Sequence, residues 1–163
     1  NLLLNVGPTP SGLVPKPCAR VLARAGAWLR KNGAAIYGTE PFTFSLQERG
    51  GHRGDWNFYG PMTMKGNSLY WLIRRPHGET ATLGGLENRV LGVHRLDTGL
   101  ALPFAQTAGR VQIDDVPEAD ETGLWPALKI ECDGPPVVYQ SGGLRIPNAP
   151  HPHYDPCPSD IAH

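Results

Sequence analysis

The sequence predicts a mainly β protein in which one βα unit precedes an antiparallel β-sandwich. A continuous apolar run at residues 2–6 is followed at 18–32 by apolar residues with helical spacing. Short alternating segments, separated by Gly or Pro, then recur as far as residue 132. The 20 Gly and 17 Pro favour many short turns over long helices. Together these patterns indicate a sheet-rich body behind a short α/β segment.

The opening run, Leu2, Leu3, Leu4 and Val6, ends abruptly at Gly7-Pro8. An unbroken apolar run of this length is typical of a strand that is covered on both faces, as in a parallel sheet. Such a strand needs parallel neighbours, and the residues after it supply one helix and then strands of antiparallel character. We therefore expect the chain to be a piece of a longer protein.

The helix is predicted at residues 18–32. Pro15 and Pro17 fall where the first turn of a helix tolerates proline, and Asn32-Gly33 predicts a left-handed residue at its end. One apolar stripe runs along the predicted helix: Val21, Leu22, Ala25, Trp28 and Leu29. Because of this spacing, we expect Trp28 to be a packing residue, and we expect the same of Trp71 in its strand.

The strands of the predicted sandwich follow from alternation and turn residues. They are expected at 43–47, 62–65, 68–74, 81–83, 89–96, 100–105, 110–114 and 127–132. Gly66-Asn67 is a two-residue connection suited to a tight hairpin, and the apolar arm after it is predicted to be central in its sheet. In the last strand, Leu128, Ile130 and Cys132 should point inward.

Charge and cysteine usage exclude several classes of protein. The 15 basic and 15 acidic residues balance, so a nucleic-acid partner is not expected. No apolar run approaches the roughly 20 residues of a membrane span, so no membrane partner is expected either. The cysteines, Cys18, Cys132 and Cys157, are odd in number and form no CxxC pair, which predicts neither a disulfide framework nor a zinc knuckle.

The tail at 139–163 holds five Pro and no sustained periodicity, which is typical of an extended linker. It contains donors of the type that bind metals: His151, His153, Cys157 and His163. Tetrahedral zinc needs four donors on a defined scaffold, and the spacing here matches no such site. We therefore predict a solvated tail without a metal.

The opening residues carry a family resemblance. The stretch NLLLNVGPTPSGLVP and the later AGAWLRKNGAAIYGTEPF resemble the closing strand and helix of the catalytic (β/α) barrel in the α-L-fucosidases, family 29 of the glycoside hydrolases. Ser11, Val14, Ala27 and Ala34 stand where that family usually has Asp, Ile, Glu and Glu.

The resemblance continues to about residue 134. Residues 64–70, MKGNSLY, are similar to the hairpin that opens the family's C-terminal β-sandwich, and residues 83–86, 90–96 and 117–130 follow the order of that domain. The fold expected from this resemblance is an α/β remnant, the last βα unit of a TIM-like barrel at 1–41, followed by an antiparallel β-sandwich at 42–138 and the tail at 139–163.

The resemblance also implies an activity. Family members are retaining glycosidases that use an Asp nucleophile and a Glu or Asp acid/base, remove terminal fucose from glycans and need no metal or organic cofactor. Both catalytic carboxylates would lie upstream of Asn1, since no acidic residue of this chain matches a catalytic position. The chain alone is therefore expected to be inactive. A secreted, periplasmic or lysosomal compartment would follow from the same resemblance, while the oligomeric state is left open.

Two residues are candidate substrate contacts. Asn5 would lie at the C-terminal end of the closing strand, where barrel enzymes form their active sites, although the same residue can instead tie down a turn. Trp56, with His52 in the polar loop at 49–60, is a candidate for an aglycone subsite, against the alternative that it packs in a core. The rival functional class is a non-catalytic carbohydrate-binding or structural β-sandwich module.

Overall fold

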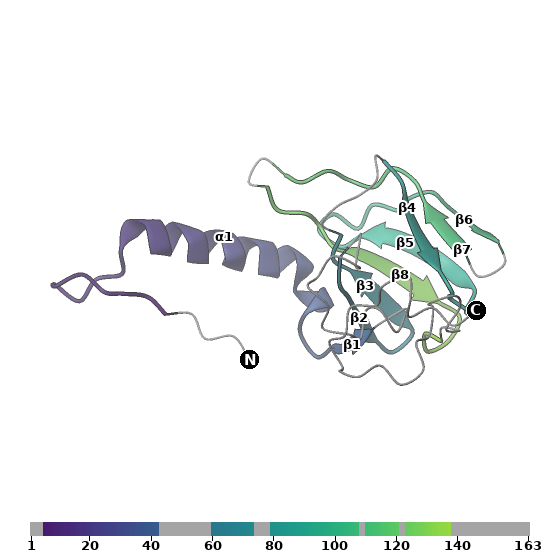
Figure 1. Ribbon diagram of the computed structural model, residues 1–163, viewed down its shortest axis with the longest axis horizontal. Coiled ribbons are helices and arrows are strands. Elements are labelled where there is room, and N and C mark those ends of the chain that lie inside the picture. The colour runs from purple at the N-terminus through teal and green to yellow at the C-terminus, as the bar shows by residue number, and fades with distance from the viewer. Residues whose placement is uncertain (1–4, 43–59, 74–78, 108–109, 121–122, 138–163) are drawn as a thin grey trace, which may run out of the picture.

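The computed structural model describes residues 5–42, 60–73, 79–107, 110–120 and 123–137. Within these residues, one long helix projects from a body of two antiparallel sheets (Figure 1). The predicted fold class, a single βα remnant followed by a β-sandwich, is confirmed in its mainly antiparallel composition and its one long helix.

The larger sheet has the strand order β1-β2-β3-β8-β5. Its strands are β1 (Glu40–Phe42), β2 (Met62–Lys65), β3 (Ser68–Trp71), β8 (Leu128–Cys132) and β5 (Val90–Arg95). The predicted hairpin is confirmed, because Lys65 pairs with Ser68 across Gly66, whose φ of 57° a residue with a side chain rarely adopts. The predicted central place of β3 is confirmed too, since β3 pairs with β2 on one side and with β8 on the other.

The smaller sheet has the order β4-β7-β6, with β4 (Ala81–Gly84), β7 (Arg110–Ile113) and β6 (Phe104–Thr107). The two sheets pack around one apolar core, which draws Leu69, Val93 and Ile130 from the larger sheet and Val111 and Ile113 from the smaller one. The predicted alternation in β8 is confirmed, since Leu128, Ile130 and Cys132 are buried while the residues between them are half-buried.

One predicted strand is displaced along the chain. The segment 100–105 was expected to be a strand, but β6 begins only at Phe104, and before it Ala101 forms a single bridge with His94. Pro103 explains the difference, because proline has no N–H to donate to a continuous ladder. The predicted strand at 43–47 lies outside the described residues.

The helix α1 (Lys16–Asn32) begins at the predicted prolines, with Pro15 at its N-cap. The predicted end at Asn32 is confirmed, but the left-handed conformation expected at Gly33 is wrong. Gly33 has right-handed dihedral angles (φ −61°, ψ −24°), and the chain continues as a short 3-10 helix, η1 (Gly33–Ala35). The left-handed residue is Gly38, with a φ of 65°. The Asn32 side chain donates to Trp28 O, one turn earlier in α1, and accepts from Ala127 N of the sandwich.

The segment before α1 is irregular where it is described. Asn5 and Val6, the end of the strand predicted at 2–6, do not form a strand. A strand requires hydrogen-bonded neighbours, and no described residue pairs with these two. The turn that follows is held by Thr9, whose N–H donates to Leu13 O and whose carbonyl accepts from Gly12 N. In the described part of the chain, no helix is both long and apolar enough to cross a membrane.

Candidate functional site

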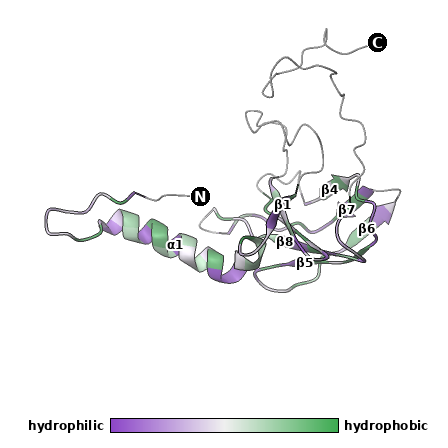
Figure 2. Ribbon diagram, turned by 90° about the horizontal axis from the view of Figure 1, so that it is seen from below, coloured by the Kyte–Doolittle hydropathy of each residue, from purple (hydrophilic) through white to green (hydrophobic). Residues whose placement is uncertain are grey.

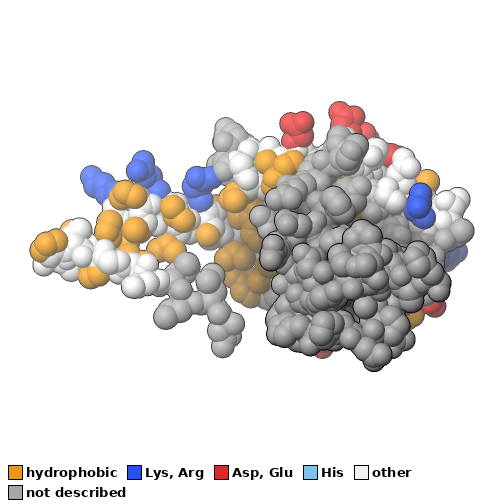
Figure 3. Space-filling view, viewed as in Figure 1, with side chains coloured by type: hydrophobic (Ala, Val, Ile, Leu, Met, Phe, Trp, Pro, Cys, Tyr) orange, Lys and Arg blue, Asp and Glu red, His pale blue; other side chains and the backbone are white. Residues whose placement is uncertain are grey.

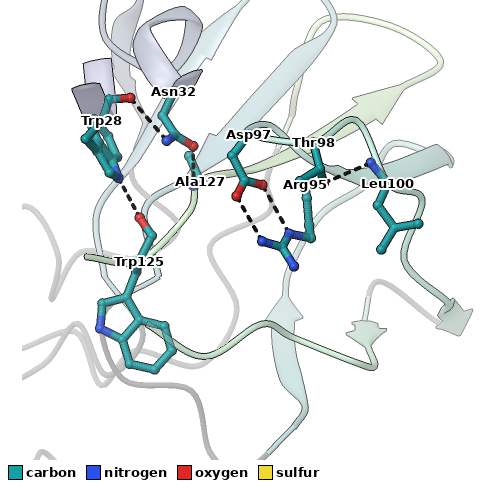
Figure 4. A network of polar contacts seen from close by, with 8 residues as sticks. All are labelled: Trp28, Asn32, Arg95, Asp97, Thr98, Leu100, Trp125 and Ala127. Atoms are coloured by element: carbon teal, nitrogen blue, oxygen red, sulfur yellow. Dashed lines mark hydrogen bonds and ion pairs between the residues drawn. The ribbon is translucent and has the colours of Figure 1, made fainter. Parts of the chain in front are cut away.

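Helix α1 is joined to the sandwich by two hydrogen bonds at its C-terminal end (Figure 4). The indole Nε1 of Trp28 donates to the carbonyl of Trp125 over 2.7 Å. The Asn32 carboxamide donates through Nδ2 to Trp28 O (3.2 Å) and accepts through Oδ1 from Ala127 N (2.9 Å). Asn32 is only 2% exposed and Ala127 is fully buried. The joint therefore consists of two side-chain to backbone hydrogen bonds, buried at Asn32 and partly buried at Trp28, between segments about 95 residues apart.

A groove with a volume of about 210 Å³ lies beside this joint, between α1 and the sandwich. From α1 it is lined by Arg24, Ala27, Trp28 and Lys31, whose spacing of i, i+3, i+4 and i+7 places them on one face of the helix. The sandwich side contributes acidic residues, Asp97, Glu118 and Asp120, together with Arg95 and the apolar Leu124 and Pro126. The groove therefore combines side chains of both charges with an apolar surface.

An ion pair orders one wall of the groove. Arg95 donates from Nε to Asp97 Oδ1 over 3.1 Å and from its terminal nitrogen to Asp97 Oδ2 over 2.9 Å (Figure 4). The tight turn after β5 brings these two residues together: Gly99 N donates to Arg95 O, and Gly99 has a φ of 74°. A bidentate pair of this kind fixes the direction of both side chains.

A second polar cluster lies on β8 and β5. Lys129 Nζ lies 2.5 Å from Glu131 Oε1, and His94 Nδ1 lies 3.9 Å from Glu131 Oε2. The hydrogen bond from Lys129, followed by the charge of Lys129, lowers the pKa of Glu131 below its usual value of 4.5. These groups are partly exposed on the sheet surface, so this cluster is a solvated set of charges.

The two cysteines in the described residues are free thiols. Cys132 is buried in the core, and burial, with a smaller contribution from the charge of Asp133, raises the pKa of its thiol to about 11. A thiol with so high a pKa is a poor nucleophile at neutral pH. Across the described ranges, no three His, Cys, Asp or Glu side chains gather into a group that would hold a metal ion.

The candidate substrate contacts predicted from the sequence remain predictions. Asn5 is exposed in the irregular segment before α1. Trp56 and His52 lie outside the described residues, as do the potential metal ligands of the tail. The groove and the Asn32 joint were not predicted. Their members lie far apart in the sequence, and the only signal was the i, i+3, i+4, i+7 spacing of the groove-lining helix residues.

Known proteins similar to this chain are α-L-fucosidases. It is 35% identical over 85 residues to an α-L-fucosidase of Branchiostoma floridae, covering 52% of this chain and 17% of that protein. It is 35% identical over 71 residues to the tissue α-L-fucosidase of Mus musculus, covering 44% of this chain and 15% of that protein. The structure resembles that of α-L-fucosidase isoenzyme 1 from Paenibacillus thiaminolyticus, with a TM-score of 0.65 and 25% identity over 82% of this chain and 31% of that one. No protein-family model matches.

These similarities define the class first: the helix and sandwich have the fold of one part of a glycoside hydrolase. More specifically, the chain is a relative of the α-L-fucosidases, as the resemblance of its motifs implies. It spans only 17% and 15% of the length of the two curated relatives.

Proposed function

We propose that this chain is the C-terminal part of a retaining α-L-fucosidase that hydrolyses terminal α-L-fucosyl linkages in oligosaccharides or glycoconjugates. Residues 1–41 would supply the last strand and helix of the catalytic barrel, 42–138 the sandwich, and 139–163 a linker or tail. The observation that carries the proposal is the 35% identity to animal α-L-fucosidases across as many as 85 residues.

The surface of α1 supports this proposal. Val21 is 64% exposed and Leu22 39% exposed, and before the helix Leu13 and Val14 are 67% and 50% exposed. Hydrophobic and hydrophilic residues alternate along the ribbon of the projecting helix (Figure 2), and the space-filling view shows apolar side chains on its visible face with Lys and Arg along the upper edge (Figure 3). A helix that closes a barrel would bury such an apolar face against the neighbouring strands and helices. The proposal therefore explains why this face has no cover within the described residues.

In this proposal the chain supports catalysis without performing it. The nucleophile and the acid/base would belong to barrel strands that precede Asn1, and the reaction would pass through a covalent glycosyl-enzyme without a metal. Asn5, at the end of the closing strand, would border the sugar pocket, and Trp56 would contribute to an aglycone subsite. The joint formed by Trp28 and the buried Asn32 would fix the sandwich to the last helix of the barrel.

The test is an assay with an aryl α-L-fucoside on two proteins. One is this chain, and the other is a longer protein that also contains the residues encoded upstream of Asn1. We expect no turnover from the chain alone, and turnover from the extended protein that a mechanism-based fucosidase inactivator abolishes. An extended protein without fucosidase activity would refute the proposal and favour a non-catalytic module. Turnover by the 163-residue chain itself would refute the assignment of both carboxylates to the upstream segment.

A further inference from the structure

The groove between α1 and the sandwich has the size of a site for a small ligand. Its volume is about 210 Å³, below the roughly 300–1,000 Å³ of pockets that enclose drug-sized molecules. It therefore admits one ring with its substituents and not an extended chain. All of its lining residues lie within the described part of the molecule.

The charges that line the groove cancel. Arg24, Lys31 and Arg95 contribute three cations, and Asp97, Glu118 and Asp120 contribute three anions. A site for a phosphate or a carboxylate concentrates charge of one sign, which attracts the opposite charge. A balanced lining favours instead an uncharged ligand that both donates and accepts hydrogen bonds.

The polar and apolar groups of the groove are held in place before any ligand arrives. Asp97 is fixed by two hydrogen bonds from Arg95, and the Trp28 ring is fixed by its bond to Trp125 O. The indole of Trp28, with Leu124 and Pro126, supplies an apolar surface on the same groove. Preorganised groups lose little freedom on binding, so a small ligand gains more of the available interaction energy.

We propose that this groove binds one neutral pyranose ring. Sugar hydroxyls donate to carboxylates such as Asp97 and Glu118 and accept from the cations of α1, while the C–H face of a sugar ring packs on an aromatic or apolar surface. Arg24 and Lys31 lie on the side of α1 away from Leu22, and Trp28 lies between these cations and the apolar stripe, so the groove runs along the edge of the apolar face.

The test is a titration of the full chain with L-fucose, D-glucose and inorganic phosphate, followed through the indole N–H signals of its four tryptophans by NMR. We expect the Trp28 signal, assigned with Trp28→Phe, to shift saturably with at least one sugar. The dissociation constant should lie in the millimolar range, as the small number of contact atoms implies. Phosphate should produce no saturable shift.

Two substitutions locate the site. Asp97→Asn should weaken sugar binding about tenfold, because a hydrogen bond to a charged acceptor is lost. Glu118 is exposed, so Glu118→Gln should weaken sugar binding only about threefold. Glu87→Gln, at an exposed carboxylate that does not line the groove, is the matched control and should leave binding unchanged. If Asp97→Asn fails to fold, the binding measured for Glu118→Gln decides whether the site lies in the groove.

The proposal is overturned if neither sugar gives a saturable shift, if phosphate binds more tightly than either sugar, or if Glu118→Gln binds as the wild type does. Because binding is measured without turnover, its failure is distinct from failure of the proposed activity.

Discussion

Replacing Asn32 with alanine should loosen the contact between α1 and the sandwich. Asn32 is 2% exposed, and its Oδ1 accepts from Ala127 N over 2.9 Å at a position where Ala127 is fully buried. Removing the carboxamide leaves this amide buried without its partner, which costs about 1–3 kcal/mol. The lost bond from Nδ2 to Trp28 O adds to the cost. We expect a total of about 2–3 kcal/mol in the free energy of unfolding.

Urea unfolding followed by tryptophan fluorescence measures this loss as a lower midpoint with an unchanged slope. Thermal unfolding should show a decrease of about 2–4 °C for each kcal/mol. Asn67→Ala is the matched control, because Asn67 is exposed in the β2–β3 turn and its side chain should contribute less than about 0.5 kcal/mol. Hydrogen exchange at the Ala127 amide gives a site-specific test, since its protection should fall in the Asn32 variant. A loss below about 0.5 kcal/mol together with unchanged protection at Ala127 would refute the reasoning.

Three further predictions concern the sandwich. Leu128→Ala should destabilise the chain by about 2–5 kcal/mol in urea unfolding, because Leu128 is fully buried in the core; a loss under about 1 kcal/mol would contradict this. Lys129 lowers the pKa of Glu131 below 4.5, so the stability that this pair adds should be complete above pH 4.5 and decline as the pH falls through the lowered value. Lys129→Met should therefore differ from wild type least at the acid end of a pH series of unfolding curves, and a gap that widens toward acid would count against this. Burial and the raised pKa of about 11 should protect Cys132 from iodoacetamide until the chain unfolds, whereas the half-buried Cys18 should react before Cys132 does, as mass spectrometry would show.

Local patterns predicted much of the fold. The Gly66-Asn67 turn needs only its own residues and the two strands beside it, and the alternation in β8 records which face of one strand meets the core. The apolar pattern was misleading at residues 100–105, because it takes no account of the proline within that segment. Pro103 delays the start of β6, although the apolar residues around it continue the strand pattern.

The joint and the groove could not be predicted in the same way. An Asn-Gly pair after a run of apolar residues usually indicates the end of a helix. Helix α1 does end at Asn32, but the Asn-Gly pair does not indicate that the Asn32 side chain accepts from the backbone of Ala127, 95 residues further along the chain. The groove likewise requires the turn after β5 to lie beside α1, although the two are far apart along the chain. The spacing of residues predicted which side chains share a face of the helix, but it could not predict which face meets the sandwich.

The two ends of α1 differ in what holds them, and this difference bears on the proposed function. The C-terminal end is fixed to the sandwich by hydrogen bonds from Trp28 and Asn32, whereas Val21 and Leu22, about two turns earlier, remain exposed. Short helices are marginally stable in water without packing of an apolar face. The sandwich holds α1 through the joint at its C-terminal end and leaves the apolar stripe exposed, so burial of that stripe requires a second body. The catalytic barrel of a fucosidase would be such a body, and α1 would then belong to two interfaces, one polar and one apolar.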